Sequence, residues 1–500
     1  MRILFWFRKD LRLDDNGGLY EAARAAGDDV VPFYASEPAI LGRQDIAPTR
    51  VRFVLDSLAS LSRAVEAKGS RLALAHGDAA ETVLHAARAV RADAVYWNDE
   101  YEPPLIARDA RVAQALKDAG IRVRRFHDRL LVPPGAVTTG SGSPFVVFTP
   151  FARACERLPI GSPLPAPERL APHDLPPRRL ATLEALGFET GAAHWPGGAE
   201  EAHRRLRRFI GGTGAEPGAG LASYATARDL PAVPGTSRLS ADLKFGTLSP
   251  RQIVKNLREA GAADRRLAPS IAKYVAELRW RDFYAHVLFH FPHVEKGAFR
   301  RDLNALRWEG DPAHFDAWCE GRTGFPIVDA AMRELAATGF MHNRARMIAA
   351  SFLTKDLLLD WRLGERHFMR HLVDGDLASN NGGWQWCAST GTDAQPWFRI
   401  FNPALQGRKF DPEGAYVRRW VPELARVPDR WIHRPAEAPP LELAAAGVTL
   451  GETYPVPIVD HAEQRDRALA MYGGGPAGRG PAGTVAPRSS GAEPKRVNRP

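Results

Sequence analysis

Residues 374–403 read DGDLASNNGGWQWCASTGTDAQPWFRIFNP, a stretch that lacks the regular apolar spacing of a core helix or strand. It combines paired acids (Asp374 and Asp376), adjacent amides (Asn380 and Asn381), two glycines and two tryptophans one residue apart. These groups supply hydrogen bonds, close backbone approach and aromatic surface together. For a single tryptophan, a place in a helical core is the plainer interpretation, but the combination predicts a cofactor site.

Tryptophans elsewhere in the chain favour the same half of the molecule. Nine of the twelve lie between residues 280 and 431, where an even spread would put about four. The predicted site therefore belongs to an aromatic-rich second half.

Length and composition bound the class of protein. Five hundred residues with 45% hydrophobic content bury a large core and suggest two or three domains. The cysteines Cys155, Cys319 and Cys387 are far apart and lack a CxxC spacing, which argues against a disulfide framework and a zinc site. The chain has no run of eighteen apolar residues, and its start, MRILFWFRKD, meets charge too soon for a signal peptide. We expect a cytoplasmic protein with no metal and no membrane segment.

The net charge favours an anionic partner. It is +9, of which the last 28 residues, with five Arg or Lys and one Glu, supply +4. The rest of the chain carries about +5, a modest indication of nucleic acid binding.

The first 127 residues predict a parallel sheet covered by helices, because short apolar runs alternate with helical patterns. The predicted strands cover 3–7, 30–34, 71–75 and 94–97, and the predicted helices lie near 50–67, 80–91 and 106–119. We expect a Rossmann-like α/β domain over residues 1–130. However, WFRKDLRLDDN at 6–16 stands where a dinucleotide-binding GxGxxG would follow the first strand.

Three further segments follow this domain. Residues 131–202 are crowded with Pro and Gly, which predicts a long surface linker. From 203 to 472 apolar residues recur at helical spacing and strand signals are few, so we expect an all-helical domain. The last segment, 473–500, has 12 Gly or Pro and no apolar periodicity, which predicts disorder.

Hydroxyl groups gather in GTSRLS at 235–240, before a predicted helix. Thr236, Ser237 and Ser240, with nearby backbone N–H groups, form a suitable cradle for a diphosphate. Such clusters are more often helix N-caps, so this motif alone is a weak signal.

An acid, two aromatic rings and a guanidinium share one helix face in AELRWRDFY. Glu277, Trp280, Arg281 and Tyr284 fall at i, i+3, i+4 and i+7. Such a stripe grips a base-like ligand by stacking and hydrogen bonding. A buried Trp beside a surface ion pair is an equally good interpretation of these residues alone.

A mixed polar and apolar wall is predicted in MHNRARM at 341–347. Asn343 and Met347 lie four apart on a helix, with Arg344 and Arg346 to either side. An amide and a thioether facing one pocket form an adaptable wall. Without context, a helix N-terminus with solvated arginines explains the motif more simply.

Three indoles fall in different helical segments of the second half: Trp308, Trp361 and Trp384. As isolated residues they are core packing. Together they could form a conduit for electrons from the surface to the interior.

Taken together and in order, these segments resemble the photolyase/cryptochrome flavoproteins, specifically the class I cyclobutane pyrimidine dimer (CPD) photolyases. The resemblance runs from residue 6 to about 460 and is carried by WFRKDLRLDDN, GTSRLS, TGFPIVDAAMREL, MHNRARM, DGDLASNNGGWQW and FRIFNP. It implies an α/β antenna domain, a long linker, and a helical domain that holds FAD in a folded conformation.

The resemblance implies roles for residues around the cofactor. Arg346 would pair with the acid near the flavin ring, and Asn380 would face the flavin N5, where a neutral amide stabilises the reduced ring. Trp308, Trp361 and Trp384 would relay an electron inward during photoreduction. Tyr274 stands where the family more often has Trp. The residues that would bind FAD are Tyr224, Thr236, Ser237, Arg238, Leu239, Ser240, Tyr274, Arg346, Asp374, Asp376 and Asn380.

The partner implied by the resemblance is UV-damaged DNA. A pyrimidine dimer is already poorly stacked, so extruding it into a pocket costs less than flipping an intact base. Phosphate contacts would position the duplex without reading its sequence. The DNA-contacting residues would be Glu277, Trp280, Tyr284, Asn343, Met347 and Trp386 toward the dimer, and Arg228, Arg281 and Arg344 toward phosphates.

The activity implied is light-dependent repair of the dimer, a carbon-carbon lyase reaction. Light would excite fully reduced FAD, one electron would pass to the dimer, the ring would split, and the electron would return. Glu277 would donate a hydrogen bond or a proton to the dimer. We expect the protein to act as a monomer.

Two alternatives share this fold. A cryptochrome, a blue-light photoreceptor, would bind partners instead of catalysing repair. Against it, Asn380 stands where plant and animal photoreceptors tend to carry Asp or Cys, and Asn343 with Met347 replaces the two histidines of the (6-4)-photoproduct group. A flavin electron carrier without repair activity would show no preference for damaged DNA.

A second, light-harvesting chromophore is left open by the sequence. The family's folate site uses an Asn-Glu pair after the strand that ends near Trp97, whereas this chain has Pro104 and Leu105 there. This difference disfavours folate. A deazaflavin, another flavin and an empty pocket are the alternatives, among which the sequence does not choose.

Overall fold

The first part of the chain is a five-stranded parallel sheet. A computed structural model describes residues 1–189, 191, 193–212 and 218–473. The strand order is β3-β2-β1-β4-β5, and Ile3 at the centre aligns with Val30 on one side and Ala94 on the other. The Rossmann-like α/β prediction is confirmed. The strands are β1 (Ile3–Phe7), β2 (Val30–Ser36), β3 (Ala73–His76), β4 (Ala94–Asn98) and β5 (Arg122–Phe126).

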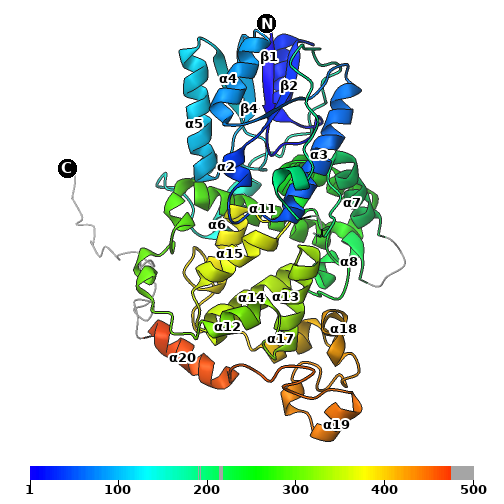
Figure 1. The fold of residues 1–500 in the computed structure, drawn as a ribbon, viewed down its shortest axis with the longest axis vertical. Helices are drawn as coiled ribbons and strands as arrows, with labels where there is room; N and C mark the ends of the chain where they lie inside the picture. The colour runs from blue at the N-terminus through cyan, green and yellow to red at the C-terminus, as the bar shows by residue number, and fades with distance from the viewer. Residues whose placement is uncertain (190, 192, 213–217, 474–500) are drawn as a thin grey trace, which may run out of the picture.

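Helices cover both faces of this sheet, as Figure 1 shows. Phe5 points toward the face covered by α1 (Gly17–Ala26) and α3 (Pro48–Glu66). Trp6 points to the other face, covered by α4 (Ala79–Ala89) and α5 (Pro103–Asp118). Because β1 is buried on both faces, its sequence is a continuous apolar run. A short helix, α2 (Pro38–Leu41), follows β2.

Besides the short helix α2, two elements of this domain were not predicted from the sequence. β5 reads RVRRF and lies at the sheet edge with its arginines largely exposed, so no apolar run marks it. α1 follows directly on the polar WFRKDLRLDDN motif, and Asn16 starts it by accepting a hydrogen bond from the Leu19 N–H. In both cases neighbouring charged residues obscure the apolar spacing from which strands and helices are predicted.

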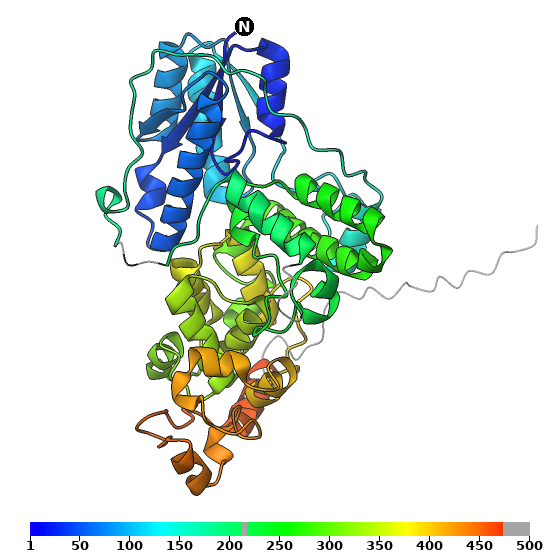
Figure 2. The same cartoon turned by 90° about the vertical axis from the view of Figure 1, so that its right-hand side faces the viewer.

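A long connection with little regular structure joins β5 to the helical part. Figure 2 shows it running along the outside of the α/β domain before it enters the green helices. It contains α6 (Phe148–Glu156) and a short 3-10 turn, Glu184–Leu186. α6 packs on α11 (Ala268–His290), since the ring centroids of Phe151 and Phe283 are 5.4 Å apart.

The second part of the chain is built from helices, which confirms the predicted fold class. None of the helices in the described residues is long and apolar enough to cross a membrane. Residues 474–500 lie outside the described residues, so the predicted disorder of the tail stays a prediction. The further helices are α7 (Ala199–Gly211), α8 (Gly220–Ala227), α9 (Ser240–Phe245), α10 (Pro250–Ala263), α12 (Ala313–Cys319), α13 (Pro326–Thr338), α14 (Asn343–Ser351), α15 (Trp361–His371), α16 (Leu377–Cys387), α17 (Pro403–Phe410), α18 (Ala415–Trp420), α19 (Pro440–Ala445) and α20 (His461–Gly473).

Short turns complete this part. Phe352–Asp356 is a π-helical turn between α14 and α15. The 3-10 turns are Arg265–Leu267, Pro292–Glu295, Arg301–Ala305, Pro422–Leu424 and Pro435–Glu437.

The stretch that lacks apolar periodicity contains helix α16. This helix begins because the Asp376 carboxylate accepts a hydrogen bond from the Ser379 N–H and so caps its first turn. Local capping therefore forms a helix here where hydrophobic spacing gives no signal.

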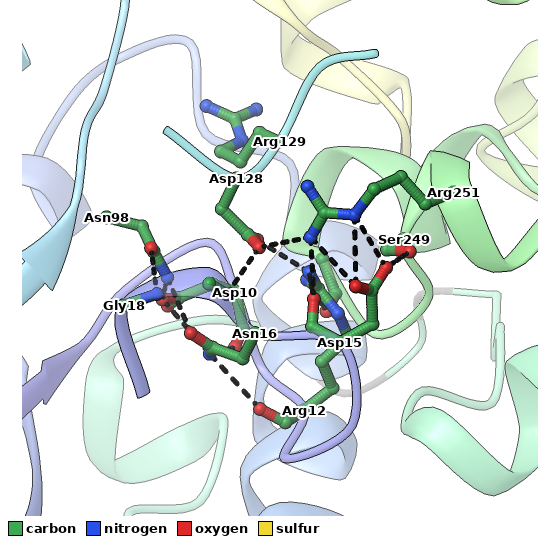
Figure 3. Close-up of polar contacts among 12 residues, drawn as sticks. Asp10, Arg12, Asp15, Asn16, Gly18, Asn98, Asp128, Arg129, Ser249 and Arg251 are labelled. Carbon is green, nitrogen blue, oxygen red and sulfur yellow. Dashed lines mark hydrogen bonds and ion pairs between the residues drawn. The ribbon is translucent and has the colours of Figure 1, made fainter. Parts of the chain in front are cut away.

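The WFRKDLRLDDN motif joins the two parts of the molecule. Figure 3 shows Arg251 of α10 reaching Asp15, at 2.9 Å, and Asp128, at 3.2 Å. Arg12 also contacts Asp128, at 2.6 Å. Gly246 (φ 63°) allows the backbones to meet, because a Cβ there would lie 2.4 Å from a main-chain oxygen of the motif. Where a phosphate-binding turn would stand, the motif thus forms buried ion pairs that connect the α/β part to the helical part.

Candidate functional site

A cavity of about 530 Å³ opens in the helical part, and the predicted site residues surround it. Its walls come from α8, the segment before α9, α11, α14 and α16. Every residue predicted to bind the cofactor or DNA lines this cavity. Of the three tryptophans predicted as a relay, Trp384 alone is in the lining.

Hydroxyl groups form one wall of the cavity. The Ser237 hydroxyl lies 2.8 Å from the Tyr274 hydroxyl, so the Tyr that departs from the family pattern is tied to the GTSRLS segment. Burial raises the pKa of Tyr274 to about 12, which keeps it a neutral hydrogen-bonding group. The N-cap of α9 is Leu239, whose side chain makes no capping bond. The N-cap interpretation of this cluster is therefore not what the structure has.

Acidic residues form another wall. Arg346 of α14 donates to both carboxylate oxygens of Asp374, at 3.1 and 2.9 Å. This is the pairing of Arg346 with an acid that the sequence predicts. The exposed fractions of the two side chains, 25% and 4%, show that the carboxylate is the buried partner.

Asp376 sits among cations deeper in the same wall. Arg129 approaches it at 3.8 Å from the α/β side of the molecule. Burial alone would raise the pKa of Asp376, but Lys244, Arg129 and Arg281 hold it well below its usual range. Asp376 therefore stays a carboxylate that can accept hydrogen bonds from a bound molecule.

Asn380 has a fixed orientation on the cavity wall. Its Nδ2 donates to the Glu365 carbonyl oxygen at 3.0 Å, which leaves Oδ1 as the acceptor for a ligand. The neighbouring Asn381 donates to the Glu365 carboxylate at 2.9 Å and is buried behind the wall. Burial raises the pKa of Glu365 to about 7. The two amides predicted together thus divide into a cavity group and a supporting group.

The predicted face of α11 is confirmed, because Glu277, Trp280, Arg281 and Tyr284 all line the cavity. Glu277 does not stand alone, however. Arg228 of α8 donates to its carboxylate. Two residues predicted for separate roles, on the dimer and on a phosphate, are therefore partners of one another.

Arg281 corrects the sequence-based assignment. Its Nη1 donates to the Arg129 carbonyl oxygen at 2.7 Å, and its Nη2 donates to the Leu243 carbonyl oxygen at 2.9 Å. Because both Nη atoms of Arg281 donate to carbonyl oxygens inside the protein, its guanidinium is not available to a DNA phosphate. We therefore reassign Arg281 to holding the cavity wall together.

The N-terminal turn of α14 carries the polar and apolar wall. Asn343 is exposed and Met347 half-buried, with Nδ2 and Sδ 3.9 Å apart. Arg344 contacts Asp229 at 2.9 Å and lies over the Phe410 ring at 4.2 Å from its centroid. The arginines of this motif are thus engaged with the protein, and the simpler interpretation as solvated side chains is wrong.

Of the relay tryptophans, Trp308 is half-buried, whereas Trp361 and Trp384 are both buried. Trp308 is half-buried, with its ring edge toward Tyr472 at 6.4 Å between centroids. Trp361 begins α15 and is 2% exposed. Trp384 on α16 packs against Phe368 at 4.9 Å and lines the cavity. The electron conduit itself stays a prediction.

Two basic residues of the cavity lining, Lys244 and His342, were not predicted from the sequence. Lys244 is buried, and burial lowers its pKa to about 7. His342 caps α14 by accepting from the Arg344 N–H at 3.2 Å, and burial lowers its pKa to about 4. Lys244 could have been predicted from its place in the short run DLKF, beside apolar residues. His342 could have been predicted from its place directly before the helix that begins at Asn343.

An α/β domain joined to a helical domain with a polar, aromatic cavity defines a two-domain protein that binds a nucleotide-type cofactor. Residues 3–168 match the model of the DNA photolyase family, and residues 274–474 match the model of the FAD binding domain of DNA photolyase. The deoxyribodipyrimidine photo-lyase of a Synechococcus species is 43% identical, over 94% of this chain and 96% of that protein. The chain therefore belongs to the DNA photolyase family of FAD-binding proteins, as the resemblance predicts.

Solved structures agree with this membership. A bacterial class III photolyase from Agrobacterium tumefaciens has a TM-score of 0.86 at 41% identity, covering 95% of this chain and 97% of that chain. A cryptochrome of Synechocystis has a TM-score of 0.85 at 29% identity, covering 94% and 99%. A photolyase and a cryptochrome therefore share this architecture.

The lining of the cavity fits FAD. It offers hydroxyl groups near Ser237, carboxylates at Asp374 and Asp376, and the Asn380 Oδ1. Gly383 is part of the wall, and a Cβ there would meet nothing within 4 Å, so this part of the wall is set back. In the described ranges, no group of three or more His, Cys, Asp or Glu is placed to hold a metal ion.

Proposed function

We propose that the protein is a class I deoxyribodipyrimidine photo-lyase that repairs cyclobutane pyrimidine dimers in UV-damaged DNA under light. One observation carries this function. Trp280, Met347 and Trp386 line the same cavity as Asn380 and Asp374. A surface suited to stacked pyrimidines and a cofactor site therefore share one space, as a transfer between cofactor and base requires.

The residues of the wall hold the cofactor and set its environment. When bound, reduced FAD excited by light supplies the electron that splits the cyclobutane ring. Ser237 and its neighbours would hold the phosphates, and Asp374 and Asp376 would accept hydrogen bonds from the cofactor. The Asn380 Oδ1 would accept a hydrogen bond from the flavin and so favour the reduced ring.

The aromatic residues select the damage. Trp280 and Trp386 provide flat surfaces for two pyrimidines held side by side, and Met347 adapts to their shape. A dimer leaves the duplex at lower cost than an intact base, so the pocket selects damaged sites without reading sequence. Glu277, oriented by Arg228, reaches the dimer, and in its protonated form the carboxyl group donates a hydrogen bond as negative charge develops there.

Positive charge brings the duplex to the cavity. Arg344 lies at the rim, with 17% of its side chain exposed, and its partner Asp229 is more exposed at 35%. A DNA phosphate competes with Asp229 for this guanidinium. Because Arg344 and Asn343 lie on the same helix, binding of the DNA backbone is thereby coupled to the part of the cavity wall that carries Asn343. Arg228, the residue that follows α8, adds positive charge for a phosphate while it keeps its contact with Glu277.

The relay supplies electrons to oxidised cofactor. An electron passes from Trp308 at the surface through Trp361 to Trp384, which lines the cavity. We assign this domain organisation to residues 1–130 for the antenna domain, 131–202 for the linker and 203–472 for catalysis. The protein acts as a cytoplasmic monomer, and for its α/β antenna domain the alternatives to folate are a deazaflavin, another flavin and an empty pocket.

A blue-light photoreceptor is the second candidate, because the Synechocystis cryptochrome shares the architecture. A binding and repair assay separates the two. Purified protein is mixed with an oligonucleotide that carries one dimer, and restored strand is measured after blue illumination and in darkness. Repair that depends on light supports the photolyase. A coloured protein that neither prefers the dimer nor restores it contradicts the proposal and favours the photoreceptor.

The absorption spectrum of the same preparation tests the cofactors. Spectra recorded before and after denaturation identify FAD and any second pigment released with it. Protein that comes out colourless and cannot be reconstituted with flavin would contradict the function.

A further inference from the structure

Trp280 is covered on one face by a residue from the connecting segment. Phe148, the first residue of α6, stacks on Trp280 with ring centroids 3.7 Å apart and an interplanar angle of 8°. Trp280 lines the cavity, whereas Phe148 is outside the lining. Trp280 therefore lines the cavity while it stacks on a residue that lies outside the lining.

Two other aromatic residues pack beside the same indole. Phe283 meets Trp280 at 5.8 Å in an edge-on arrangement, and Tyr284 meets it at 5.6 Å. Both neighbours belong to α11, the helix that carries Trp280. Phe148 is thus the partner that comes from outside the helix and the one that stacks on the ring plane.

Phe148 is itself anchored by the loop that follows α16. Its backbone N–H donates to the Asp393 carboxylate at 3.1 Å, and the N-cap residue of α6, Val147, has no side-chain capping bond. Asp393 thus caps α6 from a distant segment, and its charge suits the positive end of the helix. The same loop also contacts Trp386, which lines the cavity, because the Gln395 N–H donates to the Trp386 carbonyl oxygen at 3.2 Å.

We propose that Phe148 is a positioning residue for recognition of the pyrimidine dimer, acting through Trp280. The inference rests on the proposed function of Trp280 as a stacking surface. By holding one face of the indole, Phe148 fixes the plane that the other face presents to the extruded bases. Without it, the indole samples other rotamers, and binding must order it again.

The test compares the affinities of Phe148→Ala and wild-type protein for an oligonucleotide with one dimer and for the same oligonucleotide undamaged. We expect Phe148→Ala to lose roughly 3- to 10-fold in affinity for the dimer, the factor expected when one aromatic stacking partner is removed. Affinity for undamaged DNA and the bound flavin content stay at the wild-type level. Phe148→Tyr, which keeps the ring, restores the affinity. Val147→Ala, a neighbour that is 42% exposed, is the matched control and leaves the affinity unchanged.

A double-mutant cycle shows whether Phe148 acts through Trp280. In a Trp280→Ala background, Phe148→Ala is expected to cause no further loss of dimer affinity. An equal loss in both backgrounds would overturn the inference, and so would wild-type affinity in Phe148→Ala. Wild-type protein without any preference for the dimer would instead remove the proposed function itself. Phe148→Leu, which keeps apolar bulk without a stacking ring, gives the same reading if the Ala variant fails to fold.

Discussion

Arg50 of α3 donates two hydrogen bonds to the carbonyl oxygen of Leu372, at 3.1 Å from Nε and 2.8 Å from Nη2. Its Nη2 also donates to the carbonyl oxygen of Met369. Carbonyl groups at the end of a helix have no partner within it, so a guanidinium from the α/β domain completes the end of α15. Leu372 stands two residues before Asp374, so this contact ties the α/β domain to the acidic wall of the cavity.

Removing the Arg50 guanidinium is expected to loosen that wall. Arg50 is 5% exposed, and Arg50→Met would take the guanidinium donor from the carbonyl oxygens of Met369 and Leu372, leaving Leu372 with the Gly375 N–H at 3.3 Å. We expect a loss of about 2–4 kcal/mol in stability and weaker retention of flavin. Urea denaturation followed by circular dichroism and by flavin absorbance measures both. Arg63→Met, an exposed position on the same helix, is the control, and equal midpoints for the two variants would contradict this role.

The pairing of Arg228 with Glu277 predicts a split between binding and catalysis. Glu277→Ala removes the group that meets charge on the dimer, so the repair yield should fall by about two- to fivefold, as expected for one hydrogen bond. Binding of the dimer should change little, because the stacking surfaces remain. Quantitative repair per absorbed photon and a binding titration measure the two quantities. Glu277→Gln, which keeps a hydrogen-bonding side chain, should keep most of the yield, and a wild-type yield in Glu277→Ala would rule the role out.

The sequence predicts the α/β architecture well because its central strands are buried on both faces. Apolar runs such as residues 3–7 then have no other explanation. Other parts of the fold could not be predicted. β5 carries its arginines on an exposed sheet edge, so no apolar run marks it. The ion pair of Asp15 and Arg251 joins residues 236 positions apart in the sequence. Contacts of that range have no local signal.

The cavity could likewise be predicted as a set of residues but not as a set of contacts. Helical spacing shows that Glu277 and Arg281 share a face, yet it does not show that Arg281 turns to two carbonyl oxygens. Phe148 comes from the connecting segment, whose composition predicts only a surface loop. Contacts between cavity residues and distant segments depend on how the chain packs, so they cannot be predicted from local sequence.

The buried Asp282 predicts a pH dependence of stability. It is 1% exposed and accepts from the Val132 N–H at 3.0 Å, and burial raises its pKa to about 7 despite the nearby Arg281. Because the folded pKa lies above the unfolded value, this contribution is complete below the unfolded pKa, near 4, and is lost as pH rises toward 7. The loss across that window is on the order of 4 kcal/mol.

Asp282→Asn isolates this contribution. An amide stays neutral at every pH and still accepts from the Val132 N–H, so stability between pH 4.5 and 7 should fall less steeply than in the wild type. Denaturation midpoints at several pH values measure the slope. A variant whose midpoints decline in parallel with those of the wild type would show that Asp282 is not the titrating group.

Trp384 is the relay residue at the cavity wall, which predicts that photoreduction and repair can be separated. Its indole packs against Phe368 at 4.9 Å and Trp318 at 6.1 Å, so Trp384→Phe keeps an aromatic ring but removes the residue that passes an electron inward. We expect light-driven reduction of oxidised flavin to slow by about tenfold or more, since one missing carrier lengthens the transfer. Repair by chemically reduced protein should stay near the wild-type level, because that reaction needs the reduced cofactor and not the relay. Trp318→Phe is the matched control, as Trp318 is equally buried and touches Trp384 but does not line the cavity. If both variants photoreduce at the same rate, the path to the cofactor does not run through Trp384.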